Sequence, residues 1–253
     1  MLVLLSPAKK LNESAQAIDS CTHPLFIKDA EKLIQSLRKY SAKDLGTLMK
    51  LSPALADLNV NRYKSWAPDH RLNVNPAAVM FNGEVYAGLD AISFSETEKE
   101  RAQNQLRILS GLYGLLRPYD LVHPYRLEMG TKLKTGSKNN LYEFWGDKIV
   151  DEVNAITATQ KEEVVVNLAS NEYFKSINKK KLNATVVTPV FKDFNNGQYK
   201  TVMVYAKKAR GFMAAYIIKN KIEKIDDLIG FDTQGYCYNK EASTAKEIVF
   251  YRG

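Results

Sequence analysis

Five short stretches of the chain gather residue types that bind anions or exchange protons. They are Ser6–Lys9, Leu109–Pro118, Pro124–Gly130, Asn167–Lys175 and Tyr205–Gly211. Each stretch adjoins a predicted strand or helix, and binding sites are usually built at such element ends. We predict that they line one cleft for an anionic ligand, with these candidate residues: Ser6, Lys9, Ser110, Arg117, Tyr125, Arg126, Asn167, Ser170, Tyr173, Lys175, Lys207, Lys208 and Arg210.

The arginines favour a phosphate or a phosphodiester as that ligand. Arg117 and Arg126 each offer a planar guanidinium fork, which suits phosphate or carboxylate oxygens. Lys207 and Arg210 are three residues apart at the start of a predicted helix, where backbone amides also favour anions. The alternative is that Arg117 and Arg126 pair with Asp120 or Glu128 in a buried network.

Two glutamates in the same stretches are candidates for a general acid or base. Glu128 and Glu172 have arginine, lysine and tyrosine neighbours that can shift a carboxyl pKa. Lys9 or Tyr173 would assist the chemistry. The alternative is that each glutamate is an ion-pair partner that holds two loops together.

Two short matches to penicillin-binding enzymes do not predict that chemistry. Ser6–Lys9 reads S-x-x-K and Lys134–Gly136 reads K-T-G. In those enzymes the serine begins a helix, whereas Ser6 follows a predicted strand and no S-D-N element occurs. The chain also has no Walker loop and no G-x-G-x-x-G stretch.

Neither a metal site nor a disulfide framework is expected. His23, His70 and His123 are scattered along the chain without metal-ligand spacing. Cys21 and Cys237 are far apart and form no C-x-x-C motif. We therefore expect no metal, no cofactor and a reducing, cytoplasmic environment.

The positive charge of the chain is concentrated in one region. The 253 residues carry a formal net charge of +8. Twelve basic residues but only three acidic ones lie between Asn171 and Lys224, so this region holds the whole excess. Such a region attracts polyanions, although a solvated lysine-rich surface explains the composition equally well. No stretch reaches the roughly 20 apolar residues that span a bilayer, so we expect no membrane partner.

Strand and helix patterns alternate along the chain without repeats or a linker. Buried strands are predicted at Met1–Leu5 and 164–168, and a short strand at 107–110. A strand or a hairpin around Asn82-Gly83 is predicted at 77–86, and hairpins are predicted around Asn195–Gly197 and within 236–251. Helices are predicted at 24–40, 41–50, 53–66, 95–106, 141–156 and 208–220. This order indicates an α/β (mixed α+β) fold: a single compact domain, 1–253, on a mixed β-sheet, with the early helices as a subdomain.

The chain resembles the YaaA family of peroxide-stress proteins over nearly its whole length. The resemblance rests on LLSPAKKL, FNGEVYAGLDA, LRILSGLYGLLRPYDLVHPYRLEMGTKL, LYEFWGDKI, NLASNEYFKS, KKLNATVVTPVFKD and YAKKARGFMAAYII. It implies a cytoplasmic bacterial protein that protects cells from hydrogen peroxide and iron-dependent damage. It also implies a positively charged cleft that binds DNA, and a helix-hairpin-helix-like element at 41–66. The turn of that element holds Ser52 and Pro53, where such hairpins generally use glycine.

The leading hypothesis is therefore a DNA-binding protein that grips the backbone of duplex or distorted DNA as a monomer. Tyr125 and Tyr173 would stack on exposed bases. The alternative is an enzyme that processes a nucleotide or nucleobase in the same cleft, with Glu128 or Glu172 as its acid or base.

Overall fold

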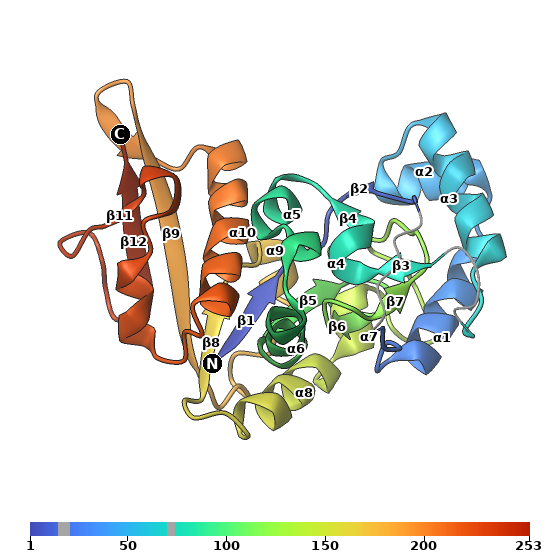
Figure 1. Cartoon of the computed structure of the whole chain (residues 1–253). Helices are drawn as coiled ribbons and strands as arrows, with labels where there is room; N and C mark the ends of the chain where they lie inside the picture. Colours follow the sequence, from blue (N-terminus) through green and yellow to red (C-terminus); the bar gives the residue numbers. More distant parts are fainter. Residues whose placement is uncertain (15–20, 70–73) are drawn as a thin grey trace.

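A parallel sheet forms the centre of the computed structural model, which describes residues 1–14, 21–69 and 74–253 (Figure 1). Its parallel strands are β1 (Leu2–Leu5), β5 (Leu106–Ser110), β8 (Val164–Asn167), β9 (Thr185–Asn195) and β12 (Glu247–Arg252). The order across the sheet is β11-β12-β9-β8-β1-β5-β6, with the short β10 paired to β9. Only the edge strands β6 (Gly114–Leu116), β10 (Gln198–Lys200) and β11 (Cys237–Tyr238) run antiparallel to their neighbours.

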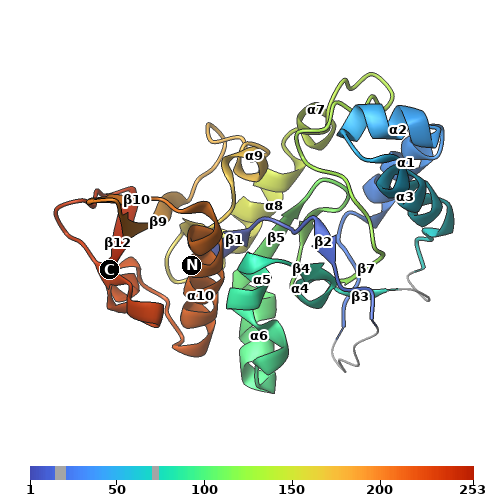
Figure 2. The ribbon, with the colours of Figure 1, turned by 90° about the horizontal axis from the view of Figure 1, so that it is seen from above.

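Helices cover both faces of the sheet, which explains why β1 and β8 are buried at every position. Both strands are apolar except for Asn167, the last residue of β8. On one face lie α5 (Glu84–Leu89), α6 (Glu96–Gln105) and α10 (Met203–Lys219), and on the other α8 (Lys148–Thr157) and α9 (Asn171–Phe174) (Figure 2). The sheet and its helices form the main hydrophobic core.

The chain reverses direction across the sheet at β1. From β1 it reaches β5 on one side, and it later places β8 and β9 on the other side. Loops that leave β1 and β8 at their carboxyl ends therefore diverge, and open α/β sheets bind ligands in the crevice at such a point. Ser6 and Leu168 begin these two loops.

Three helices form a separate layer at the end of the molecule that lies beyond β6 (Figure 1). They are α1 (Ile27–Leu37), α2 (Ala42–Met49) and α3 (Pro53–Ser65). Ser41 and Ser52 are N-caps, as their side chains accept hydrogen bonds from the backbone N–H of Asp44 and Leu55. Lys50 ends α2 in the left-handed conformation, with φ 54°.

The helical layer is attached to the sheet through aromatic side chains. Tyr63 donates its hydroxyl to the backbone oxygen of Arg126. Trp66 donates Nε1–H to the hydroxyl of Tyr113 over 2.9 Å. The predicted fold class is thus confirmed: a mixed α/β domain with an N-terminal helical subdomain.

Three local predictions are wrong. The Asn82-Gly83 stretch is no hairpin: α4 (Ala77–Met80) precedes β4 (Phe81–Asn82), which pairs with the distant β2 (Lys10–Leu11), and Gly83 then starts α5. The predicted 141–156 helix breaks at Gly146, where φ is 50°, into α7 (Leu141–Trp145) and α8. Helix α10 starts at Met203 rather than near Lys208, so the preceding strand is short.

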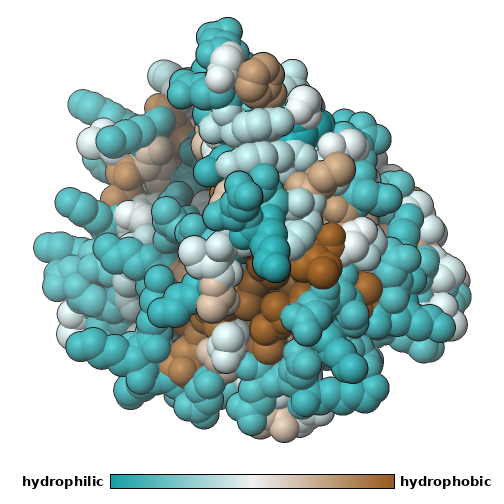
Figure 3. Space-filling model, turned by 90° about the vertical axis from the view of Figure 1, so that its left-hand side faces the viewer, coloured by the Kyte–Doolittle hydropathy of each residue, from teal (hydrophilic) through white to brown (hydrophobic). Residues whose placement is uncertain are grey.

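The remaining elements are short. Strand β3 (Asn75–Pro76) pairs with β7 (Leu121–Val122), and single 3₁₀ segments span Ala91–Ser93, Ile225–Gly230 and Thr233–Gly235. Seen from the side of β11 and β12, the surface is mostly hydrophilic with an apolar patch near its centre (Figure 3). In the parts of the chain described, no helix is long and apolar enough to cross a bilayer.

Candidate anion-binding pocket

A pocket of about 530 Å³ lies at the carboxyl ends of β1 and β8. Five segments line it: the loop after β1, the Asn82–Tyr86 turn into α5, the 125–131 loop with Glu128, the loop after β8, and the first two turns of α10. Its position is the crevice that the reversal of chain direction at β1 creates. The polar or charged side chains that line it are Ser6, Lys9, Lys10, Asn82, Glu84, Tyr86, Glu128, Ser170, Glu172, Tyr173, Lys207 and Arg210.

Two serines join the loops that diverge at this point. Ser6 Oγ accepts a hydrogen bond from the backbone N–H of Ser170 over 2.8 Å and lies 3.3 Å from Ser170 Oγ. Tyr86 donates its hydroxyl to the backbone oxygen of Ser6 over 2.9 Å. The pocket floor is therefore fixed by hydrogen bonds between β1, β8 and α5.

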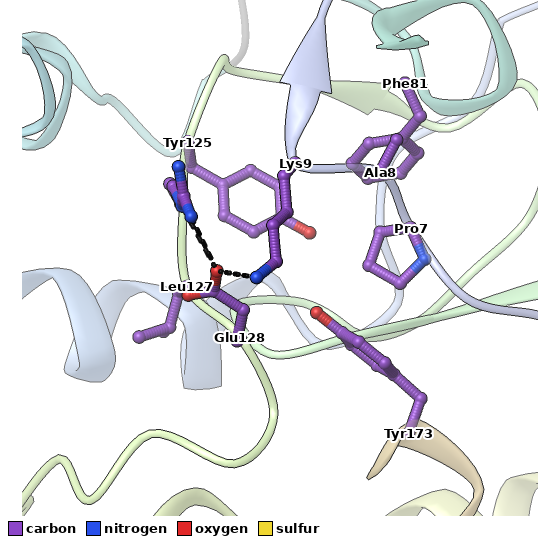
Figure 4. A pocket seen from close by; sticks show the side chains of 9 residues that line it. Pro7, Ala8, Lys9, Phe81, Tyr125, Leu127, Glu128 and Tyr173 are labelled. Carbon is purple, nitrogen blue, oxygen red and sulfur yellow. Dashed lines mark hydrogen bonds and ion pairs between the residues drawn. The ribbon is translucent and has the colours of Figure 1, made fainter. Parts of the chain in front are cut away.

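On one side of the pocket, two cations share the carboxylate of Glu128. Its Oε1 lies 3.3 Å from Lys9 Nζ and 3.1 Å from Arg126 Nε (Figure 4). The Lys9 side chain is 69% exposed, whereas those of Arg126 and Glu128 are 18% and 16% exposed. Arg126 therefore forms an ion pair with Glu128, which is the alternative that the sequence left open.

Arg210 differs from Arg126 because it has no acidic partner. Arg210 and Lys207 lie one turn apart on α10 and both line the pocket. Within the described residues, neither side chain makes a hydrogen bond or an ion pair. Burial lowers the pKa of the Arg210 guanidinium below its ordinary value. A partly buried cation without a partner is costly, and a bound anion would offset that cost.

Glu172 supports the rim of the pocket. Its Oε1 accepts a hydrogen bond from the backbone N–H of Gly130 over 2.9 Å. The hydroxyl of Tyr142 donates to its backbone oxygen, and the ammonium of Lys175 lies 5.4 Å from the centre of the Tyr142 ring. Lys175 itself does not line the pocket. Glu172 therefore holds the 125–131 loop against α9 while its side chain faces the cavity.

Two of three neighbouring buried tyrosines, Tyr86 and Tyr173, line the pocket, whereas Tyr125 does not. Tyr86, Tyr125 and Tyr173 are 7%, 4% and 8% exposed. Burial raises the pKa of each hydroxyl above its ordinary value, so all three stay protonated at neutral pH. The prediction that Tyr125 and Tyr173 stack on bases is wrong, because these buried rings present too little surface. Tyr125 instead packs edge-on against Phe81 and Tyr113.

Several predicted site residues lie outside the pocket. Arg117 binds Asp120 and the backbone oxygen of His23, which is the alternative that the sequence left open. Ser110 is fully buried and contacts the Tyr125 hydroxyl over 2.7 Å. Asn167 is buried and accepts from the backbone N–H of Ala169, and the ammonium of Lys208 lies over the ring of Phe212.

The pocket thus contains part of the predicted set and some residues that the sequence did not single out. It brings together Ser6, Lys9, Ser170, Tyr173, Lys207 and Arg210 with both candidate glutamates. The polar residues that the sequence did not single out are Lys10, Asn82, Glu84 and Tyr86, and the last three belong to the stretch for which it predicted a strand or a hairpin. Its unusual FNGEVYAGLDA sequence was the available signal.

No metal centre is present among the described residues, where no three or more His, Cys, Asp or Glu side chains form a group that could hold an ion. His23 and His123 each have partners elsewhere. His70 lies outside the residues that the structure describes.

Comparisons with known proteins give one consistent match. Residues 1–242 match a family model described as "Peroxide stress protein YaaA". A protein of Shewanella pealeana is 50% identical over 254 residues, covering 100% of this chain and 99% of its own. Proteins of Shewanella woodyi and Aliivibrio fischeri are 52% and 51% identical, covering 99% and 98% of their own chains and 100% of this one. All three are called UPF0246 proteins.

Proposed function

The chain belongs to the family of the peroxide stress protein YaaA, and from this premise we propose that it protects cells from peroxide by binding DNA. Family membership supports the role in peroxide stress. The proposal adds that the cationic wall of the pocket takes phosphates of the DNA backbone. Iron and peroxide damage DNA, so a protein that holds DNA during such stress can limit that damage. We expect the protein to carry out this role in the bacterial cytoplasm.

The observation that supports phosphate binding best is the Arg210 side chain. It is partly desolvated, lines the pocket and has no carboxylate partner in the described structure. A guanidinium in this state binds a phosphate with charge-assisted hydrogen bonds. Lys207 lies one turn away on the same helix face and adds a second positive charge.

The test is DNA binding across a salt series, with fluorescence anisotropy of labelled duplex as the readout. Each phosphate contact contributes roughly 0.9 to the slope of log affinity against log salt. We expect Lys207→Gln/Arg210→Gln to lower that slope by about 1.8 and to weaken binding at low salt. Lys219→Gln is the matched control, because Lys219 lies about 18 Å farther along α10 at a rise of about 1.5 Å per residue. Binding that does not depend on salt would refute the proposal. Equal losses of salt slope in Lys207→Gln/Arg210→Gln and in Lys219→Gln would refute it as well.

An enzymatic function is the second candidate, because Glu128 and Glu172 face the same pocket. The reaction would process a nucleotide or nucleobase with one carboxyl as acid or base. Glu128→Gln separates the two functions. For DNA binding, losing this carboxylate releases Lys9 and Arg126 to bind phosphate, so affinity rises. For catalysis, the same variant loses turnover of nucleotide substrates.

A further inference from the structure

We infer that the pocket holds one nucleotide at a time, presented as an unpaired residue of DNA. This inference rests on the proposed DNA binding and specifies its ligand. A volume of about 530 Å³ is that of a small-ligand pocket. A duplex cannot enter it, whereas a single nucleotide that has left the base stack can.

The α10 side of the pocket is suited to the two phosphates that flank this nucleotide in the strand. Arg210 and Lys207 project from α10 without acidic partners among the described residues. Of the other two cations that line the cavity, Lys9 is paired with Glu128, and Lys10 makes no ion pair among the described residues. Helix α10 thus contributes two of the three unpaired cations of the pocket.

The two glutamates that line the pocket are suited to the polar edge of a base. Glu172 Oε1 accepts from Gly130, and Glu128 Oε1 accepts from Arg126. In the described structure, the second oxygen of each carboxylate accepts no hydrogen bond. Such oxygens accept hydrogen bonds from the amino and imino groups on the Watson–Crick edge of a base.

Much of the remaining pocket surface is apolar. Its apolar side chains include Pro7, Ala8, Val85, Leu168 and Met203. A sugar and a planar base can pack against such side chains, whereas a free phosphate or a small dicarboxylate would leave them without contact. The combination of cations, apolar walls and acceptors therefore matches the three parts of a nucleotide.

The test compares two DNA ligands that differ in one nucleotide. One is a duplex with 2-aminopurine opposite an abasic site, and the other is the same duplex fully paired. We expect the wild type to bind the first roughly ten- to a hundredfold more tightly, as expected for one or two charge-assisted hydrogen bonds, with increased 2-aminopurine fluorescence. Glu172→Gln should reduce that ratio toward 1, while Lys219→Gln keeps it.

Other outcomes separate this inference from the proposed function. Salt-dependent DNA binding with equal affinity for both duplexes and unchanged fluorescence would overturn the inference alone. Binding of free deoxyadenosine monophosphate in calorimetry, lost in Arg210→Gln and without any DNA binding, would support a nucleotide pocket and refute the DNA function. Failure to bind either DNA or the free nucleotide would overturn both.

Discussion

Three arginines with the same side-chain chemistry have different roles because their neighbours differ. Arg117 is bound to Asp120, and Arg126 to Glu128, so each has a carboxylate partner within the fold. Arg210 has no such partner in the described part of the chain. Residue type alone predicts that all three can hold a phosphate. Only Arg210 is left to do so, and the sequence could not reveal this because the partners depend on tertiary contacts.

At the residue scale, we predict that Ser110→Ala lowers stability rather than ligand affinity. Ser110 Oγ accepts from the backbone N–H of Tyr113 over 2.8 Å and contacts the Tyr125 hydroxyl over 2.7 Å. All three groups are buried. Alanine leaves two buried polar groups without this partner, which costs about 1–3 kcal/mol of unfolding free energy.

Urea unfolding measures that change, and Ser36→Ala is its control. Ser36 lies on α1, where its hydroxyl contacts only the backbone of the preceding turn. Its loss should change the free energy of unfolding by less than about 0.5 kcal/mol. A Ser110→Ala protein of wild-type stability with weakened DNA binding would contradict the structural role and restore Ser110 to the binding site.

At the scale of elements, the pocket wall depends on a close crossing of α5 and α10. A Cβ on Gly211 would lie 1.9 Å from the backbone oxygen of Val85, and one on Gly88 would lie 2.3 Å from that of Lys208. No side chain fits between backbones at such distances. These two glycines therefore let α10 approach α5 closely enough to place Lys207 and Arg210 on the cavity.

We predict that Gly211→Ala destabilises the protein and weakens ligand binding together. The helices must separate to admit the methyl group, and overpacking of this kind costs about 1–3 kcal/mol. Gly46→Ala in α2 is the matched control, because its Cβ would meet no atom closer than 3.5 Å. Since alanine is the better helix former, that variant should gain up to about 1 kcal/mol. Thermal unfolding of both variants measures these changes in stability. If Gly211→Ala and Gly46→Ala changed stability equally, the close crossing of α5 and α10 would not be the cause of the destabilisation.

Elements with strong local signals could be predicted from the sequence, and those determined by distant partners could not. The Ser95 capping box, the Ser52-Pro53 helix start and the β-branched Val164–Val166 run all predict what the structure has. The Asn82-Gly83 turn signal failed because Asn82 pairs with Lys10. The pocket follows the same division: residues after β1 and β8 were predicted, but those at the start of α5 required the tertiary fold.

At the scale of the whole molecule, the basic region between Asn171 and Lys224 does not form one surface. Lys181 is paired with Asp147, Lys192 lies over Tyr251, and Lys219 lies over Phe94 at the end of α10. Because these positions are spread over the loop before β9, β9 itself and the end of α10, only a fraction of the excess charge faces the pocket. The local composition predicted a polyanion partner but not where its phosphates would be held.

The α2–α3 hairpin is a second part of the described structure that was expected to hold a DNA phosphate, in this case through backbone amides. In its turn, the backbone N–H of Leu51 donates to Gly46, that of Leu55 donates to the Ser52 side chain, and Pro53 has none. Lys50 occupies the left-handed position that glycine usually takes. These amides are already used within the fold or missing, so we expect the hairpin to contribute little to phosphate binding.

The difference between the α2–α3 hairpin and the pocket predicts how much each contributes to the salt dependence of DNA binding. Lys43→Gln/Lys50→Gln removes two exposed charges from the hairpin, the same number that Lys207→Gln/Arg210→Gln removes from the pocket. We expect the hairpin variant to keep the wild-type salt slope and the pocket variant to lose about 1.8 of it. If the hairpin variant lost as much slope as the pocket variant, DNA would have to extend across the full molecule, with the pocket as one contact among several.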